Sequence, residues 1–222
     1  MLKKLFNIFV FINIVVLTLF LNGCQSLYDS DFSLAKEKSD SIKKINLDGK
    51  IAYINDKDRG SLLFTYKKNS NISLFSADLK DINTEHLSLE MLSNSANESI
   101  ELKNPLGITE AYIFSYSNIA ILIYNNTVFY EDSLSLLLNK YFNIAIPNVA
   151  FATLIEVDPK DSNLKCTYKE NVLNSCKQTL GNFSLDSSHI KSYQNYNIAF
   201  DFSLKQDKST IKGRILNIRD IK

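Results

Sequence analysis

Apolar and polar residues alternate along much of the chain after Lys50. In one clear case, Ile198, Phe200, Phe202 and Leu204 alternate with Ala199, Asp201 and Ser203. A period of two is typical of an antiparallel strand with one buried face. The same pattern predicts strands over Leu62–Tyr66, Leu87–Met91, Ile108–Tyr116, Asn118–Tyr124 and, with blurred alternation, Thr210–Ile221. Because Asn118–Tyr124 is apolar on both faces, we expect other elements to cover each face.

Three segments depart from this alternation. Glu131-Asp132-Ser133 precedes Leu134, Leu137, Leu138 and Tyr141 at three- and four-residue spacing, which predicts a capped helix. Pro147 opens a second short helix toward Leu154, and Asp158-Pro159 ends it. Ser33–Lys44 contains good helix formers with a thin apolar stripe and is a third candidate helix. This order of elements predicts a mainly β fold with helices (α+β), in which one strongly curved antiparallel sheet carries a helical lid.

The first 24 residues have the composition of a secretory leader. Lys3 and Lys4 precede an apolar run from Leu5 to Leu21, and the run ends at Leu21-Asn22-Gly23-Cys24. Leu-x-Gly-Cys resembles the lipobox of bacterial lipoproteins, in which the cysteine is lipidated after cleavage just before it. We therefore expect a signal peptide over residues 1–23, lipidation at Cys24, a polar tether over residues 24–33 and a single domain over residues 34–222. The alternative is an uncleaved signal anchor with an incidental cysteine.

Composition narrows the class of protein. The chain has 222 residues, with 25 Lys and Arg against 24 Asp and Glu, so it lacks the strong positive charge of a nucleic-acid-binding protein. A hydrophobic share of 45%, with 14 Phe and 11 Tyr, excludes a disordered chain. Gln25 rather than Asp follows Cys24, so nothing here resembles an inner-membrane retention signal, and we expect a lipid-anchored protein on the periplasmic face of the outer membrane. We also expect a monomer with no nucleic-acid partner.

Two cysteines remain for disulfide formation if Cys24 is lipidated. Cys166 and Cys176 flank two short predicted strands around Lys169-Glu170-Asn171, so they can meet across a hairpin in an oxidising compartment. Two buried free thiols are the alternative. A metal site is not expected, because the chain has only two His residues, His86 and His189, without ligand-like spacing to either cysteine.

No motif indicates catalysis or a bound cofactor. The sequence lacks a nucleophile elbow, a phosphate-binding glycine loop, a dinucleotide fingerprint and a zinc-protease helix motif. The adjacent acids Glu131 and Asp132 are explained by the start of a helix. We therefore expect a non-catalytic protein without a cofactor.

Asn104-Pro105-Leu106-Gly107 has the residues that a type I turn prefers at its first, second and fourth positions. Leu106 then occupies the remaining corner, where side chains tend to point outward. An exposed leucine gains roughly 1.5–3 kcal/mol on entering an apolar environment. Leu106 either makes such a contact or folds back over its own hairpin.

Several short motifs resemble the family of the outer-membrane lipoprotein receptor LolB. Leu47-Asp48-Gly49-Lys50-Ile51-Ala52-Tyr53-Ile54 is similar to its first strand, and Asn104-Pro105-Leu106-Gly107-Ile108-Thr109-Glu110 to a loop and the following strand. Tyr130-Glu131-Asp132 through Leu138, then Ile146-Pro147, is similar to its helical segment. The resemblance covers Leu47–Leu154. Asn83–Ser99 departs from it as an insertion or extra hairpin, and the family's tryptophans are absent.

The resemblance implies a half-open antiparallel β-barrel whose hydrophobic cavity takes the acyl chains of lipoproteins from a periplasmic LolA-like carrier. It also implies that Pro105, Leu106 and Gly107 form a loop that inserts into the lipids of the outer membrane. The candidate cavity residues are Leu62, Phe64, Tyr66, Ile113, Ile119, Ile121, Ile123, Leu134, Leu138 and Phe151. The alternative function is a periplasm-facing lipoprotein that binds proteins or acts as an envelope scaffold, through a sheet edge or Asn83–Ser99, without a lipid cavity.

Overall fold

The computed structural model describes residues 32–34, 42–55, 59–69, 88–116 and 119–222. All of these residues belong to one compact unit, Phe32–Lys222. The expected signal peptide and the lipidation site Cys24 lie outside the described residues, as does the tether up to residue 31.

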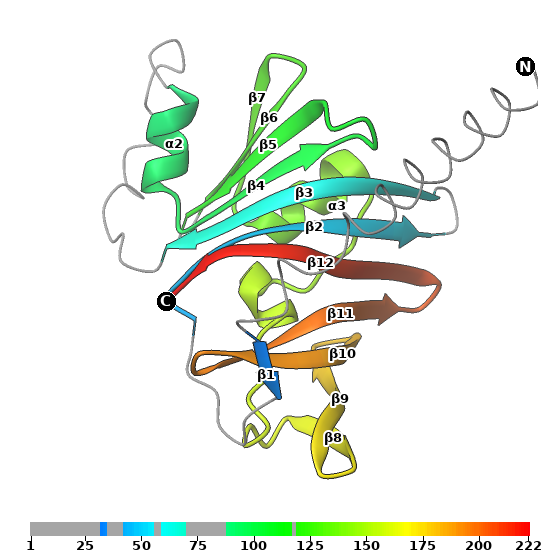
Figure 1. Cartoon of the computed structure of the whole chain (residues 1–222). Coiled ribbons are helices and arrows are strands. Elements are labelled where there is room, and N and C mark those ends of the chain that lie inside the picture. The colour runs from blue at the N-terminus through cyan, green and yellow to red at the C-terminus, as the bar shows by residue number, and fades with distance from the viewer. Residues whose placement is uncertain (1–31, 35–41, 56–58, 70–87, 117–118) are drawn as a thin grey trace, which may run out of the picture. The chain divides into compact units, whose positions relative to one another are not determined.

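The described unit is built around one antiparallel sheet with few helical elements (Figure 1). Its elements are β1 (Phe32–Leu34), β2 (Lys44–Ile54), β3 (Arg59–Asn69), α2 (Leu89–Ser95), β4 (Glu98–Lys103), β5 (Thr109–Ser115), β6 (Ala120–Tyr124), β7 (Thr127–Glu131), α3 (Leu134–Phe142), the 3-10 helix η2 (Phe151–Leu154), β8 (Leu164–Lys169), β9 (Val172–Leu180), β10 (Phe183–Tyr193), β11 (Tyr196–Gln206) and β12 (Ser209–Ile221). The strand order is β7-β6-β5-β4-β3-β2-β12-β11-β10-β9-β8, and β1 pairs with β10. The path ends at β7 and β8, so the sheet is curled but open, and the mainly β prediction is confirmed.

Tight hairpins set the register of the sheet. Asn125 and Asn126 both have positive φ between β6 and β7, and Glu170 and Asn171 do the same between β8 and β9. Two left-handed residues in a two-residue loop match the twist of antiparallel strands. The pairing of β6 with β7 therefore runs without a shift, from Tyr124 opposite Thr127 to Ala120 opposite Glu131.

The main hydrophobic core lies on the face of the sheet that carries α3 and η2 (Figure 1). Strands β2 to β6 and β10 to β12 all contribute buried side chains to this inner cluster, and α3 contributes Leu134, Leu137 and Leu138. Ser133 caps α3 by accepting a hydrogen bond from the Leu136 N–H at 3.2 Å, as the sequence predicts.

A second, outer cluster covers the opposite face of β5 and β6. It contains Leu92 and Ala96 from α2 and its C-cap, together with Phe114, Tyr116, Ile119 and Ile121. On β6, Ala120 and Leu122 face the inner cluster while Ile121 faces the outer one. The expectation that both faces of this strand are covered is confirmed.

Three predicted elements differ in the structure. Leu89 and Met91 lie in the helix α2 instead of a strand, because Ser88 caps Met91 N–H at 3.1 Å and local capping prevails over a short alternation. The predicted helix Ser33–Lys44 is wrong at both ends, where Ser33 and Lys44 belong to β1 and β2, while residues 35–41 lie outside the described part. Helical structure after Pro147 is limited to η2.

The blurred alternation of β12 has a local cause. Its register against β2 shifts between Ile215 and Asn217 and again between Ile218 and Asp220. Each shift moves the following side chains to the other face of the sheet. Ile211, Ile215, Ile218 and Ile221 therefore all reach the inner cluster although their spacing is irregular.

Candidate functional site

A small apolar cavity of about 50 Å³ lies inside the inner cluster. It is enclosed by strands on one side and by α3, residues 143–150 and η2 on the other. No polar atom lines it. Its walls are formed by Ile51, Tyr53, Leu62, Ile100, Leu102, Ile113, Leu138, Ile144, Ile146, Phe151, Leu154, Phe202, Leu204 and Ile211.

The structure brings together most of the candidate cavity residues. Leu62, Ile113, Leu138 and Phe151 line the cavity directly. The other inward members of the set, Phe64, Tyr66 and Leu134, pack in the same inner cluster without lining the cavity.

Ile119, Ile121 and Ile123 are a correction, because they lie on the other face. Ile119 and Ile121 belong to the outer cluster, and Ile123 packs against it. The side chains on both faces of β6 are apolar, so alternation alone could not decide which face points toward the inner cluster. α2, which was not predicted, supplies the apolar partner that makes the outer face buried.

Sequence reasoning missed more than half of the wall. Phe202 and Leu204 were recognised as one face of a strand, and their alternation could have placed them in the cavity. Ile51 and Tyr53 lie in the segment that resembles the family's first strand. Ile144 and Ile146 follow α3 in an irregular segment, where no periodic signal marks them.

A buried carboxyl group borders the cavity wall. The Tyr66 hydroxyl donates a hydrogen bond to Oε1 of Glu98, and the Ala152 N–H of η2 donates to the same oxygen at 3.4 Å. Glu98 is only 6% exposed. Burial raises the pKa of its carboxyl, while the hydrogen bonds from Tyr66 and Ala152 act in the opposite direction. Burial first, and then the nearby Glu98 charge, raise the pKa of the Tyr66 hydroxyl well above its usual value, so this hydroxyl remains a donor.

The Asn104–Gly107 turn has the predicted form. The Gly107 N–H donates to the Asn104 carbonyl at 2.9 Å, and the Asn104 side chain accepts the N–H groups of Leu106 and Ile108 at 3.0 and 3.1 Å. Gly107 has a φ of 80°, which favours glycine. The Leu106 side chain is 85% exposed, so it does not fold back over its hairpin.

Other exposed apolar residues lie at the same end of the sheet. β2 to β7 are consecutive antiparallel neighbours, so the turns after β2, β4 and β6 all lie at one end. Ile54 ends β2, Leu106 and Ile108 belong to the turn after β4, and Tyr124 ends β6. All four side chains are exposed. We call these residues the apolar rim.

Cys166 and Cys176 form a disulfide between directly paired residues of β8 and β9. Cys176 packs with Val157, Leu173, Ile190 and Ala199, in a third cluster separate from the cavity. Among the described residues, no three His, Cys, Asp or Glu side chains come together as metal ligands would. Within the same residues, no helix has the length and apolar character needed to cross a bilayer.

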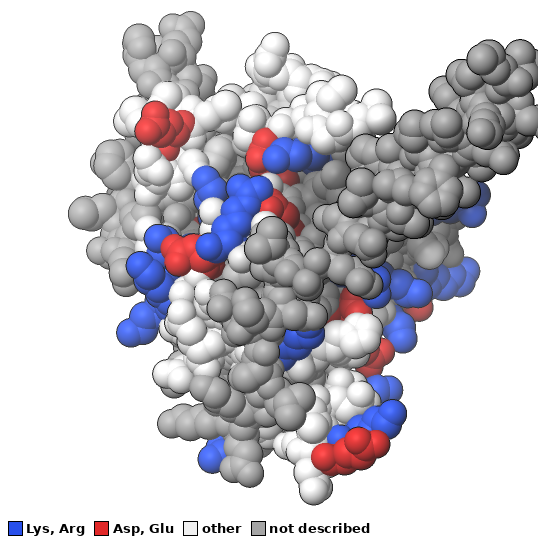
Figure 2. Space-filling view, viewed as in Figure 1, with Lys and Arg blue, Asp and Glu red and all other residues white. Residues whose placement is uncertain are grey.

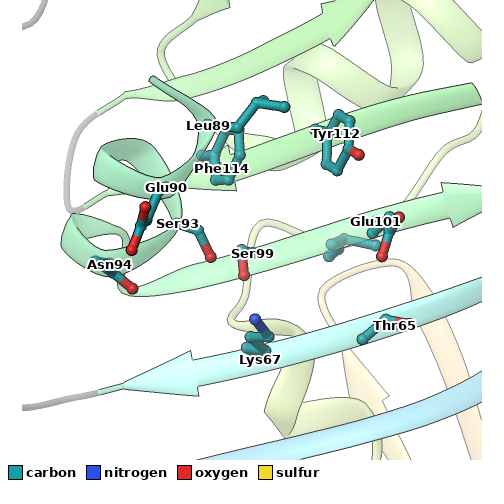
Figure 3. Close-up of a pocket in the computed structure, with 11 residues that line it drawn as sticks. Thr65, Lys67, Leu89, Glu90, Ser93, Asn94, Ser99, Glu101, Tyr112 and Phe114 are labelled. Carbon is teal, nitrogen blue, oxygen red and sulfur yellow. The ribbon is translucent and has the colours of Figure 1, made fainter. Parts of the chain in front are cut away.

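A second hollow, of about 410 Å³, lies on the outer face beneath α2 (Figure 3). Leu89, Tyr112 and Phe114 share its lining with polar side chains from α2, β3 and β4. Two carboxylates, Glu90 and Glu101, line the hollow, and Glu101 accepts a hydrogen bond from Thr109 Oγ1 at 2.5 Å and pairs with Lys103 Nζ at 2.9 Å. Burial alone would raise the pKa of the Glu101 carboxyl, but the contacts with Thr109 and Lys103 outweigh it and lower this pKa. The hollow is open and mixed in polarity, unlike the cavity.

Charges of both signs are interspersed on the face of the sheet opposite α3 (Figure 2). Arg219 binds Asp48 through two nitrogens at 2.8 and 2.9 Å, and Arg214 binds Asp201 in the same way at 2.6 and 3.2 Å. Asp48 and Asp201 on this face are therefore each paired with an arginine.

The described unit is thus an open antiparallel sheet that encloses a polar-free cavity beneath helical segments. No family model matches the chain, and no curated protein matches it. A LolA superfamily protein from Nitrosomonas europaea is similar over 84% of this chain and 90% of its own, with 6% identity and a TM-score of 0.45. A DUF1329 family protein from Desulfovibrio piger is similar over 81% of this chain and 86% of its own, with 7% identity and a TM-score of 0.41. At TM-scores this low, neither similarity carries an argument about function.

Proposed function

We propose that this chain is a non-catalytic lipoprotein, anchored through Cys24 to the outer membrane, that accepts the acyl chains of other lipoproteins and passes them to the bilayer. The observation that carries the proposal is the polar-free cavity between the sheet and its helical segments. Burial of hydrocarbon is favourable in proportion to the apolar area removed from water, and it needs no directional contact.

The size of the cavity requires that part of its cover moves. About 50 Å³ is far below the roughly 300–1,000 Å³ of typical ligand pockets. Two side-chain hydrogen bonds hold residues 143–150 of this cover: Asn55 Nδ2 donates to the Asn143 carbonyl at 3.1 Å, and Ser135 Oγ of α3 donates to the Ile146 carbonyl at 2.7 Å. An acyl chain would enter by displacing residues 143–154 from the inner face.

The apolar rim supports contact with a membrane. Leu106 and Ile108 protrude on a turn fixed by hydrogen bonds, and Tyr124 has the amphipathic side chain that is enriched at bilayer surfaces. A rigid turn can insert a leucine without first ordering a loop. In this proposal the rim places the cup next to the lipid that receives the acyl chains.

Displacement of an apolar probe tests the proposal. Dansyl-labelled undecanoic acid is titrated into the unlipidated Cys24→Ser chain, and a purified triacylated lipoprotein is then added. We expect enhanced probe fluorescence that the lipoprotein reverses, whereas the same lipoprotein stripped of its acyl chains has no effect. Absence of displaceable binding would refute the acceptor function and favour the protein-binding alternative, for which the hollow beneath α2 is the candidate surface.

A further inference from the structure

Glu98 connects the sheet to the segment that covers the cavity. It begins β4, whereas Ala152 lies in η2, and their hydrogen bond joins residues 54 positions apart in the chain. The backbone N–H of Phe151 also stabilises the charged carboxyl. The start of η2 is therefore held by one carboxylate, which Tyr66 orients from the neighbouring strand β3.

Phe151 occupies the position that an incoming chain would need. Its ring lies 4.7 Å from the Tyr66 ring, 5.5 Å from Phe64 and 6.2 Å from Phe202, measured between centroids. Phe64 and Tyr66 belong to β3 and Phe202 to β11, so the ring bridges strands that are not neighbours. Phe151 is also a wall residue of the cavity. It fills the space between the strands as a plug.

The end of η2 is fixed independently. Ala199 N–H donates to the Ile155 carbonyl at 2.9 Å, and Val157 N–H donates to the Asn197 carbonyl at 3.1 Å. Glu156 forms a β-bridge with Ile198 and accepts the Ile42 N–H at 2.5 Å. Motion of the cover is thereby confined to residues before Ile155, and the Glu98 contact lies within that movable part.

We infer that Glu98 is a positioning residue that holds Phe151 in the cavity, so that a hydrocarbon chain enters only when the Glu98–Ala152 contact opens. This inference rests on the proposed function. Glu98 also borders a solvent-open hollow of about 440 Å³ that is lined by Asn148, Val149 and Ala150 of the same cover. The contact thus lies between a solvent-open hollow and the polar-free cavity.

The charges around Glu98 come from several elements. Lys68 on β3 favours its ionised form, while Glu156 lies near its partner Tyr66. Asp132, just before α3, lines the same hollow. These groups set how firmly the carboxylate holds η2.

The association rate of dansyl-labelled undecanoic acid, measured by stopped-flow fluorescence on the Cys24→Ser chain, tests the inference. Glu98→Ala removes the acceptor and leaves the Ala152 N–H without its partner, and we expect association to become roughly tenfold faster, as for the loss of one buried hydrogen bond. Glu98→Gln keeps an acceptor oxygen for Ala152 and is the matched control, with a rate close to that of the parent chain.

A double-mutant cycle separates this role from a general loss of stability. Phe151→Ala removes the plug and should accelerate association by itself. If Glu98 acts through Phe151, adding Glu98→Ala to Phe151→Ala produces little further change. Equal acceleration by Glu98→Ala with and without Phe151 would overturn the inference and indicate a general structural role.

The remaining outcomes distinguish the two proposals. If Phe151→Ala binds the probe faster while Glu98→Ala matches the parent chain, the role of Glu98 is refuted and the acceptor function stands. If no variant binds the probe, both proposals fail. Thermal unfolding of each variant verifies that it is folded, and Tyr66→Phe, which retains the ring but not the hydroxyl, gives an independent perturbation of the same carboxylate.

Discussion

Gly213 is a single position on which the packing of the cavity wall depends. It lies opposite Phe202 in the pairing of β11 with β12, and a Cβ atom at this position would lie 2.0 Å from Cζ of Phe202. We expect Gly213→Ala to destabilise the fold by about 1–3 kcal/mol, as overpacking of a core does. Urea unfolding measures this loss, with Lys212→Ala on the exposed face as the control. An unchanged midpoint for Gly213→Ala would contradict the close contact.

Leu106 should govern attachment to lipid independently of folding. Leu106→Glu replaces an exposed apolar side chain with a charge, and we expect at least a tenfold loss of binding to phospholipid vesicles, because roughly 1.5–3 kcal/mol of apolar burial is lost. Co-sedimentation of the Cys24→Ser chain with vesicles measures this. Tyr168→Glu is the matched control, because Tyr168 is also exposed but lies beside the β8–β9 turn at the other end of the sheet. Equal losses in the two variants would argue against the rim.

Glu98 should give the fold a measurable pH dependence. Burial holds the pKa of this carboxyl above its usual value, so the folded protein binds the proton more tightly than the unfolded chain does. The stabilisation is therefore present at acid pH and is lost as the pH rises through the raised pKa. Relative to the parent chain, Glu98→Gln should gain stability between acid and neutral pH. Thermal unfolding across that range tests the sign, and a constant difference would contradict it.

At the scale of elements, we expect that loss of the disulfide loosens the β8–β9 hairpin without affecting the cavity. The disulfide closes a loop with a sequence separation of 10, which corresponds to about 2–3 kcal/mol of stabilisation. Because Cys176 packs in the third cluster, a Cys166→Ser/Cys176→Ser variant should lose this stability but bind the apolar probe as before. Urea unfolding and probe titration measure the two effects. A parallel loss of probe binding would show that the hairpin supports the cavity.

Elements with local signals were predictable, and elements set by tertiary context were not. α3 has an acidic start, the cap Ser133 and leucines at helical spacing, so the sequence indicates it directly. In α2, the short alternation of Leu87, Leu89 and Met91 imitates a strand, whereas the Ser88 cap and the packing of Leu92 and Ala96 against β5 and β6 together stabilise a helix. The bulges of β12 depend on its pairing with β2, which no local pattern specifies.

At the scale of the whole molecule, the two faces of the sheet should be separable by mutation. Ile113 on β5 lines the cavity, whereas Ile121 on β6 belongs to the outer cluster, and both are almost fully buried. Either change to Ala should cost about 2–5 kcal/mol of stability. Only Ile113→Ala should change the affinity for the apolar probe. Equal effects of Ile121→Ala on that affinity would show that the faces are coupled.

The candidate site could be predicted only in part, because the assembled sheet decides which side chains face the cavity. Leu62, Ile113, Leu138 and Phe151 were found because each lies on the apolar face of a recognisable element. The choice between Leu122 and Ile121 as the inward residue of β6 depends on what covers each face, and this is a property of the assembled sheet. The link between Glu98 and η2 joins segments that are distant in sequence, so no spacing of residues could reveal it.

The absence of polar atoms from the cavity wall has a consequence for selectivity. A wall without donors or acceptors distinguishes guests by length and volume, and each added methylene changes the free energy by only about 1 kcal/mol. It cannot recognise a head group or an amino-acid sequence. A protein that holds its cargo in this way would be a generalist, and any preference for one client over another would have to arise where the client's polypeptide meets the outside of the cup.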